Sequence, residues 1–311
     1  MDVSIIVPAW NARAFLSGAL SSALAQAGVT CEIIVADDAS TDSTADLAEA
    51  FGASVRCLRL PRNGGPAAAR NAALEAARGE WIAVLDADDA FLPGRLARLV
   101  AEAAGAGLDI IADNMWIEDA TGKRRLFIDE PLDGGLEPIG FAFYARDNRL
   151  FRRGSNSGYL KPVFRRVFLQ KHALRYDASL RIGEDFLLVA EALALGARFA
   201  RLRDAYYIYV TRDGSISSRL SAVAAAAMVR GDERLLAAHR QRLTVYELQA
   251  LRAHDRSLRD GAAYLDMVEA LKRADLRATM RAGFGRPQAM RHLTMPVTAR
   301  LRRAVRVLAA A

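Results

Sequence analysis

The sequence predicts an α/β protein, a doubly wound and mostly parallel sheet flanked by helices. Three short apolar runs, at residues 3–7, 32–36 and 81–85, are typical of strands that are buried on both faces. Stretches with helical spacing separate the runs, and this alternation predicts such a sheet. With 311 residues, 52% of them hydrophobic, the chain can bury a full core and form one large domain with an appendage.

Local signals predict the individual elements of the first two thirds of the chain. Pro8 is expected to close the first strand. Apolar residues recur with helical spacing at 15–24 and 68–77, and Pro66 lies near the first turn of the second helix, where proline is favoured. The segment 109–160 mixes two edge-type strands with loops, which we expect to form one wall of the site.

The chain changes character after about residue 221, where the alternation ends and the composition turns rich in Ala, Leu and Arg. We therefore expect a sheet domain over residues 1–220 and a helical, basic subdomain over 221–311. A Gly- and Pro-containing break is expected at 283–287. Helices of this subdomain are predicted at 222–236, 243–258 and 262–280.

A first pair of acidic residues, Asp37 and Asp38, lies at the end of the second apolar run. In doubly wound sheets ligands bind outside the carboxyl ends of the strands, so these carboxylates are candidate ligand contacts. The segment 37–42 is equally consistent with a loop in which Ser40 or Thr41 caps the next helix, and this alternative stays open.

Two more acidic clusters follow along the chain. Asp86, Asp88 and Asp89 come after the third run, and three carboxylates within four residues repel one another at neutral pH. A divalent cation would relieve that repulsion. Glu184 and Asp185 form the last cluster. The order of the clusters suggests a metal and a nucleotide diphosphate at the edge of a parallel sheet.

Five separated segments carry motifs at these positions. They are residues 3–11 (VSIIVPAWN), 33–42 (IIVADDASTD), 63–71 (NGGPAAARN), 79–93 (GEWIAVLDADDAFLP) and 183–185 (GED). In order and spacing they closely resemble the family 2 inverting glycosyltransferases of the GT-A fold, over about residues 1–220. The segments 155–168 (SNSGYLKPVFRRVF) and 181–185 are most similar to bacterial exopolysaccharide glucosyltransferases of the succinoglycan type.

The resemblance implies a metal site for the donor. A nucleotide-sugar leaves as a diphosphate, whose developing charge is stabilised by Mg²⁺ or Mn²⁺. Asp88 resembles the metal-binding second Asp of the family's DxD motif. Asp86, the first Asp, is expected to hold the ribose or to share the water shell of the metal, with Asp89 in support.

The resemblance also implies a pocket for the base. Asp38 resembles the Asp that accepts from the uracil N3–H, and Pro8, Ala9 and Asn11 would line the same pocket. Trp10 replaces the commoner Tyr of this loop, and its indole can still stack on the pyrimidine.

Three more residues are assigned to the donor by resemblance. Asn63 begins the third motif, and Arg70 matches an Arg placed near the uracil or the diphosphate. The alternative for Arg70 is a stem packed on its helix with the head in solvent. Arg212 lies in the segment 211–217 (TRDGSIS), where the family commonly has His, and it would counter the diphosphate charge without ligating metal.

Inversion requires a base that removes a proton from the acceptor hydroxyl. Asp185 resembles that base, the last residue of the family's Glu-Asp motif, and Glu184 is expected to orient its loop or to contact acceptor hydroxyls. Both residues would also favour the positive end of a helix that begins there, as the apolar segment 186–195 supports.

The charge of the chain is concentrated near its C-terminus. Residues 231–311 carry 16 Lys or Arg against 8 Asp or Glu, and no acid follows Asp275. The tail 293–311 is typical of a surface helix attracted to an anionic membrane, with each basic residue worth about 1 kcal/mol. The alternative is an extension that packs on its own domain or on the partner in a homodimer. Nucleic acid is disfavoured, because no aromatic interleaving or reading motif is present.

Remaining features suggest where the protein works. No apolar run reaches the ~18 residues of a membrane span, and Met1 leads almost directly into the first strand, so we expect a cytoplasmic protein at the inner face of the membrane. Cys31 and Cys57 are interpreted as reduced core thiols.

The prediction is a metal-dependent inverting transferase that moves a sugar, expected to be glucose, from a UDP-sugar to a lipid-linked oligosaccharide in exopolysaccharide assembly. One alternative is a nucleotidyltransferase that makes a sugar nucleotide, but the Gly-rich loop it needs after the first strand is absent. The other is an inactive scaffold, but Asp88 and Asp185 are both present. A nicotinamide dehydrogenase is disfavoured, because the first strand is not followed by Gly-x-Gly-x-x-Gly.

Overall fold

The structure is a computed structural model that describes residues 1–152, 154, 156–212 and 220–293. One mixed sheet runs through the first 210 residues, with strand order β3-β2-β1-β4-β9-β6-β10-β5, while β7 pairs with β6 and β8 with β10. The strands are β1 (Val3–Ala9), β2 (Cys31–Asp37), β3 (Arg56–Arg59), β4 (Trp81–Val84), β5 (Ala90–Phe91), β6 (Ile110–Glu118), β7 (Arg124–Leu126), β8 (Leu136–Pro138), β9 (Val163–Arg165) and β10 (Phe199–Val210).

The main strands of the sheet point in one direction. β1 is parallel to β2 and β4, β2 is parallel to β3, and β6 is parallel to β10. The short strand β9 is antiparallel to both of its neighbours, β4 and β6, so these two also share a direction. The carboxyl ends of β1, β2, β4, β6 and β10 therefore meet at one edge of the sheet, as the sequence predicts.

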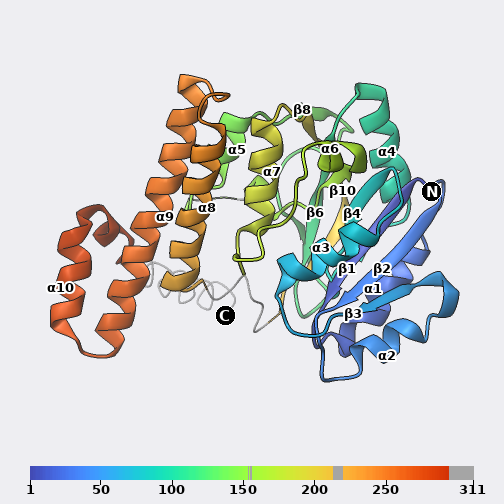
Figure 1. Cartoon of the computed structure of the whole chain (residues 1–311), viewed down its shortest axis with the longest axis horizontal. Coiled ribbons are helices and arrows are strands. Elements are labelled where there is room, and N and C mark those ends of the chain that lie inside the picture. The colour runs from blue at the N-terminus through green and yellow to red at the C-terminus, as the bar shows by residue number, and fades with distance from the viewer. Residues whose placement is uncertain (153, 155, 213–219, 294–311) are drawn as a thin grey trace, which may run out of the picture.

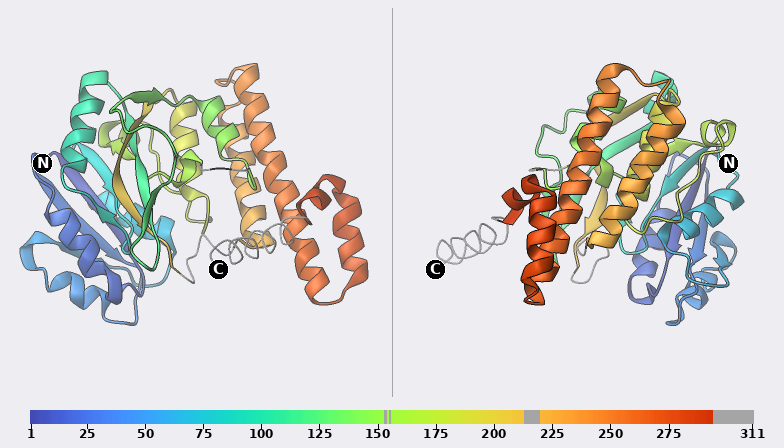
Figure 2. Two further views of the ribbon diagram at one scale, coloured as in Figure 1. Left: turned by 180° about the vertical axis from the view of Figure 1, so that it is seen from behind. Right: turned by 60° about the vertical axis from the view of Figure 1, so that its left-hand side comes forward.

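Helices cover both faces of the sheet (Figure 1), with α3 and α7 on one side and α1 and α4 on the other, as the view from behind in Figure 2 shows. The helices α8 and α9 pack beside α7, and α10 lies farthest from the sheet. The α-helices are α1 (Arg13–Leu24), α2 (Thr44–Glu49), α3 (Pro66–Ala76), α4 (Arg95–Ala106), α5 (Phe141–Asp147), α6 (Arg166–Lys171), α7 (Glu184–Ala194), α8 (Ala222–His239), α9 (Val245–Lys272) and α10 (Leu276–Gly285). Short 3₁₀ turns are η1 (Gly52–Ser54), η2 (Ser157–Tyr159) and η4 (Pro287–Leu293).

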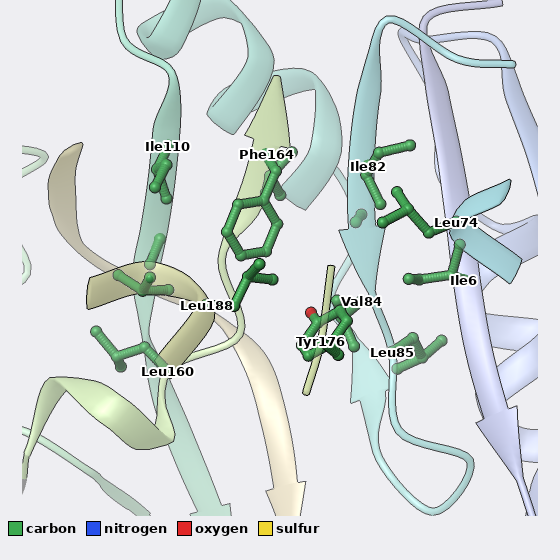
Figure 3. Close-up of a cluster of buried hydrophobic side chains, with 14 of the residues drawn as sticks. Ile6, Leu74, Ile82, Val84, Leu85, Ile110, Leu160, Phe164, Tyr176 and Leu188 are labelled. Atoms are coloured by element: carbon green, nitrogen blue, oxygen red, sulfur yellow. The ribbon is translucent and has the colours of Figure 1, made fainter. Parts of the chain in front are cut away.

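The core lies on both faces of the sheet, against α3 and α7 on one side and against α1 and α4 on the other. Figure 3 shows Leu74 of α3 beside Ile6 and Ile82 of adjacent strands, and Leu188 of α7 beside Phe164 of β9. Strands β1 and β4 are covered on both faces, and their side chains are apolar except for the buried Ser4 of β1, which is the pattern that the sequence showed.

The C-terminal helices are joined to this core. Leu235 of α8 and Ala250 and Leu251 of α9 belong to the same buried cluster as the sheet, whereas Tyr264 and Met267 form a small separate one. The boundary at residue 220 stays a prediction.

No helix in the described part of the chain combines the length and the apolar character that a membrane-spanning segment needs.

One prediction and one open alternative about the ends of elements are wrong. β1 continues through Pro8 to Ala9. Its pairing with β4 ends at Ile6, so only β2 pairs with β1 at Pro8. The missing N–H of Pro8 therefore breaks no hydrogen bond to β4. α2 begins at Thr44 with Ser43 as its N-cap, and neither Ser40 nor Thr41 caps it.

One further prediction is wrong, and another is incomplete. The segments 243–258 and 262–280 are not two helices: α9 is one 28-residue helix, opened by a capping box between Thr244 and Glu247, and α10 follows after a turn. The segment 109–160 does contain two short edge strands, β7 and β8, which each pair with one neighbour only, but the prediction missed the first and longest strand of the segment. This strand, β6, has nine residues and lies in the middle of the sheet. It was not predicted, because a buried strand lacks the strict periodicity by which strands are identified in a sequence. The two cysteines are free and partly buried, as expected for reduced thiols.

A buried ion pair lies inside the core. The Arg95 side chain, at the start of α4, is fully buried and donates to Asp113 of β6 at 2.7 Å and to the carbonyl of Lys161 at 2.7 Å. Its guanidinium also lies over the rings of Phe91 and Tyr207. This contact fixes α4, β6 and the segment that enters β9 against one another.

We expect Arg95→Met to lower the free energy of unfolding by about 3–5 kcal/mol, because it leaves the Asp113 carboxylate buried without its partner. Urea denaturation at pH 7 measures this loss. The double variant Arg95→Met/Asp113→Asn removes the uncompensated charge and should recover at least about 1 kcal/mol of it. A single variant as stable as the parent would contradict the assigned role of the pair.

Candidate active site

Loops that follow three parallel strands meet at the edge of the sheet. Trp10 follows β1, Asp38 follows β2, and Asp86 follows β4. The Asp38 N–H donates to the Ala9 carbonyl at 2.8 Å, so the first two loops continue the pairing of their strands. Topology thus places the sequence-predicted residues where ligands bind in such sheets.

Asp38 organises the loop that precedes α3. Its carboxylate is buried and accepts from the N–H groups of Gly64 and Gly65, both at 2.7 Å. Gly65 has φ of 88°, a conformation that favours glycine, and it leads directly into Pro66 at the first turn of α3. The contact therefore aims α3, which carries Arg70. A contact of Asp38 with a pyrimidine stays a prediction.

The loop after β1 is held by its neighbour. Asn11, with φ of 49°, accepts from the Thr41 N–H at 2.9 Å and donates its own N–H to Ser40 Oγ at 2.9 Å. Trp10 is 53% exposed at the tip of this loop, so its indole face is open for stacking. Pro8 is half-buried within the strand, and the side chain of Ala9 is buried.

Asn63 is engaged with protein partners. Its amide donates to the Asp38 carbonyl at 3.3 Å and accepts from Arg181 at 3.0 Å. The Arg181 side chain packs so closely on Gly65 that an added Cβ there would meet it at 3.0 Å. The structure thus gives Asn63 a part in shaping the loop before α3, and its contact with a donor stays a prediction.

Arg70 joins two of the acidic clusters. Its buried guanidinium lies 2.9 Å from Asp86 Oδ1, 2.6 Å from Glu184 Oε1 and 3.4 Å from Asp185 Oδ1. Tyr176 lies against the same guanidinium, 5.4 Å from ring centroid to Cζ. The alternative of a solvent-exposed Arg70 head is therefore wrong. The side chain links the loop after β4 to the first turn of α7.

Lys161 is the second cation of this cluster, and sequence reasoning gave it no role. Its buried ammonium lies 2.8 Å from Asp86 Oδ2 and 3.6 Å from Asp185 Oδ2. The signal that could have found it is a lone lysine between apolar residues just before the short strand β9. Three carboxylates and two cations thus form one network, called the charge cluster below: Arg70, Asp86, Lys161, Glu184 and Asp185.

Burial and charge set the protonation of this cluster. Burial alone would raise the pKa of Asp86, but the charges of Lys161 and Arg70 outweigh it and hold the pKa of this carboxyl well below its ordinary value. Burial would lower the pKa of Lys161, but Asp86 and Asp185 raise it, so the ammonium stays charged. Burial and the charge of Asp185 raise the pKa of Glu184.

Asp88 and Asp89 differ although they are adjacent. Asp89 is buried and accepts from the Tyr207 hydroxyl at 2.7 Å and from the Val210 N–H at 2.9 Å, so it fastens the end of β10 to the acidic loop. Asp88 is half-buried, and no cation of the described residues pairs with its carboxylate. Burial and the nearby charge of Asp86 raise the pKa of Asp88. Asp88 is thus the carboxylate of this loop that is available to a ligand.

Arg212 lies next to Asp88, and its contact with a diphosphate stays a prediction. Its guanidinium donates to the Asp88 carbonyl at 3.2 Å and lies 3.3 Å from the centroid of the Phe15 ring. Its Nη1 is buried without a hydrogen-bond partner among the described residues, a donor that an anionic ligand would satisfy. The rest of the segment 211–217, from residue 213 on, lies outside the described residues.

The described residues hold no group of three His, Cys, Asp or Glu side chains that would form a closed metal site by themselves. Asp88 offers a single carboxylate. Mg²⁺ and Mn²⁺ in nucleotide sites take one or two protein carboxylates together with phosphate oxygens and water, so this arrangement fits a cation delivered with a diphosphate. A divalent cation at the acidic loop stays a prediction.

Comparisons with known proteins agree with this geometry. A family model described as "Glycosyl transferase family 2" matches residues 4–168. The chain is 42% identical over 303 residues to the succinoglycan biosynthesis protein ExoO of Rhizobium meliloti, covering 97% of this chain and 86% of that protein. It is 39% identical over 266 residues to ExoU of the same organism, covering 83% and 76%.

A solved structure shares the fold. The crystal structure of S. aureus TarS, residues 1–349, in complex with UDP-GlcNAc has a TM-score of 0.62 to this chain. The alignment covers 93% of this chain and 92% of that one at 20% sequence identity. The likeness extends over the sheet and over the C-terminal helices.

We expect Lys161→Met to lower the free energy of unfolding by about 1.5–3 kcal/mol at pH 7, because Asp86 loses one of its two charged partners. The pKa of Asp86 is held low in the folded state, so its stabilising contribution is present above its unfolded pKa of about 3.9 and is lost as the pH falls through the folded value. The difference between variant and parent should therefore narrow below about pH 4.

Urea denaturation at several pH values checks this expectation. The matched control is Arg124→Met, which removes an exposed cation 2.6 Å from Glu118 and should cost less than about 1 kcal/mol. An equal loss in the two variants, or a gap that widens at low pH, would show that Lys161 does not stabilise ionised Asp86.

Proposed function

The chain belongs to glycosyl transferase family 2, and we propose that it transfers a sugar from a UDP-sugar, with inversion, to a lipid-linked oligosaccharide in exopolysaccharide assembly. The family match and the similarity over almost the whole chain confirm the predicted family and its glycosyltransferase activity, and the likeness to TarS confirms the GT-A fold with helices at its C-terminus. Donor, sugar, acceptor and metal belong to the proposal.

One observation carries the mechanism. Arg70 and Lys161 both contact Asp86 of the donor motif and approach Asp185 of the base motif, within 2.8–3.6 Å. The two motifs are about a hundred residues apart in the chain and form one site at the edge of the sheet. Such a site can hold a donor and deprotonate an acceptor beside it.

Support for the donor comes from the loops around Trp10 and Asp38. An exposed indole and a carboxylate lie at the ends of adjacent strands, where a pyrimidine would stack and donate its N–H. The structural relative with a TM-score of 0.62 was solved with UDP-GlcNAc. Glucose is the proposed sugar, on the similarity of the segments 155–168 and 181–185 to exopolysaccharide glucosyltransferases.

Asp88 would hold the divalent cation, Mg²⁺ or Mn²⁺. When bound, such an ion supplies positive charge that stabilises the departing diphosphate. The Asp88 carboxylate lacks a cationic partner among the described residues, as a ligand position requires. Arg212 would add a second positive charge to the diphosphate from the adjacent strand end.

Asp185 accepts the proton in the proposed reaction. The acceptor hydroxyl oxygen forms a bond to the anomeric carbon while the bond from that carbon to the diphosphate breaks, and UDP leaves with the electron pair. The hydroxyl proton passes to a carboxylate oxygen of Asp185. The Asp185 side chain is 21% exposed, whereas that of Glu184 is 9% exposed and held by Arg70 at 2.6 Å, so Asp185 is the more accessible base. Glu184 positions Arg70.

The acceptor and the location are proposed together. ExoO and ExoU, which cover most of this chain, are named succinoglycan biosynthesis proteins, and this supports a role in exopolysaccharide assembly on a lipid-linked oligosaccharide. The proposed location is the cytoplasmic face of the membrane. The tail 294–311, with four Arg and no acid, would be attracted to anionic lipid and lies outside the described residues. A homodimer stays a prediction.

A thermal-shift panel tests the donor and the metal together. With Mn²⁺ present, a UDP-sugar should raise the unfolding temperature, whereas GDP- and dTDP-sugars should not, because a ligand stabilises the folded state by mass action. Asp88→Asn should abolish the Mn²⁺-dependent part of the shift and the transfer activity while keeping the unfolding temperature of the free protein.

The matched control is Asp266→Asn, the same chemical change on the exposed face of α9, which should leave the shift unaltered. Because the pKa of Asp88 is raised and binding needs the ionised form, the shift should weaken as the pH falls through that raised value. Near-normal activity of Asp88→Asn would contradict the metal assignment.

For the base, we expect Asp185→Asn to bind the UDP-sugar normally and to lose about 10²–10⁴-fold in kcat, because it removes the proton acceptor. Steady-state transfer kinetics with a matched binding measurement check this. Glu184→Gln is the comparison and should lose less. If kcat of Asp185→Asn were unchanged while Glu184→Gln was inactive, the base would be Glu184.

A further inference from the structure

The helix α10 carries an apolar stripe on its outer side. Leu276, Met280 and Phe284 are spaced four residues apart, so they lie on one face, and they are 70%, 55% and 78% exposed. The other side of the helix faces α9, where Ala282 packs against the small cluster around Tyr264. α10 is the described helix farthest from the sheet (Figures 1 and 2). Single exposed apolar residues are ordinary, but a stripe of three large ones on a ten-residue helix is not.

Positive charge borders this stripe. Arg277 and Arg281 follow Leu276 and Met280 directly and are exposed, and no carboxylate of the described residues pairs with either guanidinium. Asp275 is the last acidic residue of the chain. The surface therefore combines apolar side chains with unneutralised cations, and we call it the α10 face.

We propose that the α10 face docks on an anionic phospholipid bilayer. Leu276, Met280 and Phe284 would enter the boundary between headgroups and acyl chains, while Arg277 and Arg281 would meet the headgroup phosphates. An amphipathic helix with a basic border binds such an interface through apolar burial and electrostatic attraction together. The α10 face lies within the described residues and depends neither on the basic tail nor on the donor and metal assignments.

The charge and the area of the α10 face disfavour two other occupants, a second copy of the chain and the chain's own C-terminal tail. A second copy docked through this face would bring Arg277 and Arg281 of two chains together, and three side chains offer far less than the ~800 Å² per partner of a stable interface. The chain's own residues 294–311 carry four Arg and no acid, so they would meet charge of the same sign. An anionic bilayer complements both properties of the surface.

Vesicle partitioning of the full chain tests the proposal. Vesicles of phosphatidylcholine with and without phosphatidylglycerol are the probes. Leu276→Ser/Phe284→Ser should lower the partition coefficient on the anionic vesicles by roughly tenfold or more, given the transfer free energy of large apolar side chains. Arg277→Gln/Arg281→Gln should lower it by about tenfold or more at low salt, with a difference that shrinks as salt is added.

The matched control is Val245→Ser. Val245 is 73% exposed and begins α9, at the opposite end of that 28-residue helix from α10, so its replacement should leave partitioning unchanged. Insertion is measured directly with Phe284→Trp in the otherwise unaltered chain. Brominated lipid should quench the tryptophan fluorescence of this variant more than that of the parent chain. The quenching of Val245→Trp should not exceed that of the parent chain.

Three results would overturn the proposal. The first is a full chain that ignores anionic vesicles at low salt, and the second is a Leu276→Ser/Phe284→Ser variant that partitions like the parent. The third is a fall of this variant to a smaller species in size-exclusion chromatography, which would make a second copy the occupant. UDP binding is measured on the same preparations. Its absence in every variant would overturn the proposed donor and leave the vesicle result standing.

Discussion

The ion pairing of Asp86 is the interaction on which the candidate site depends. Its two carboxylate oxygens face two different cations, Arg70 of α3 at 2.9 Å and Lys161 before β9 at 2.8 Å. The same cations lie beside Asp185 at the start of α7. Breaking a partly buried pair would leave an uncompensated charge, so separation of these elements is costly. The charge cluster therefore fixes four elements relative to one another: α3, α7, β9 and the loop that follows β4.

Further buried polar contacts carry this constraint into the core. Arg95 donates to the Lys161 carbonyl at 2.7 Å while its guanidinium pairs with Asp113, so the residue that contacts Asp86 is itself fixed from inside the sheet. On the other side of the acidic loop, Asp89 holds Tyr207 of β10 at 2.7 Å. These contacts leave Asp88 as the carboxylate of the loop without a described cationic partner, and ligand access is thereby concentrated on one residue.

The C-terminal helices connect this site to a distant surface. α8 and the first half of α9 share the main core with the sheet, so they extend the rigid scaffold, while α9 continues past it and presents α10 away from the sheet. A protein that modifies a lipid-linked acceptor needs both a preorganised site and a fixed approach to the bilayer. Under the two proposals, separate surfaces of this chain would meet these requirements, the charge cluster and the α10 face.

The sequence by itself determined the parallel strands β1, β2 and β4, the acidic loops at their ends and the family, because short apolar runs and motif spacing are local properties of the chain. Only the tertiary structure decided that Arg70 joins Asp86 to Glu184, residues 16 and 114 positions away from it, and that Lys161 completes the cluster. It also placed β6 inside the sheet and showed the stripe on α10. Ion pairs and burial arise between segments far apart in sequence, and local periodicity carries no record of which segments meet.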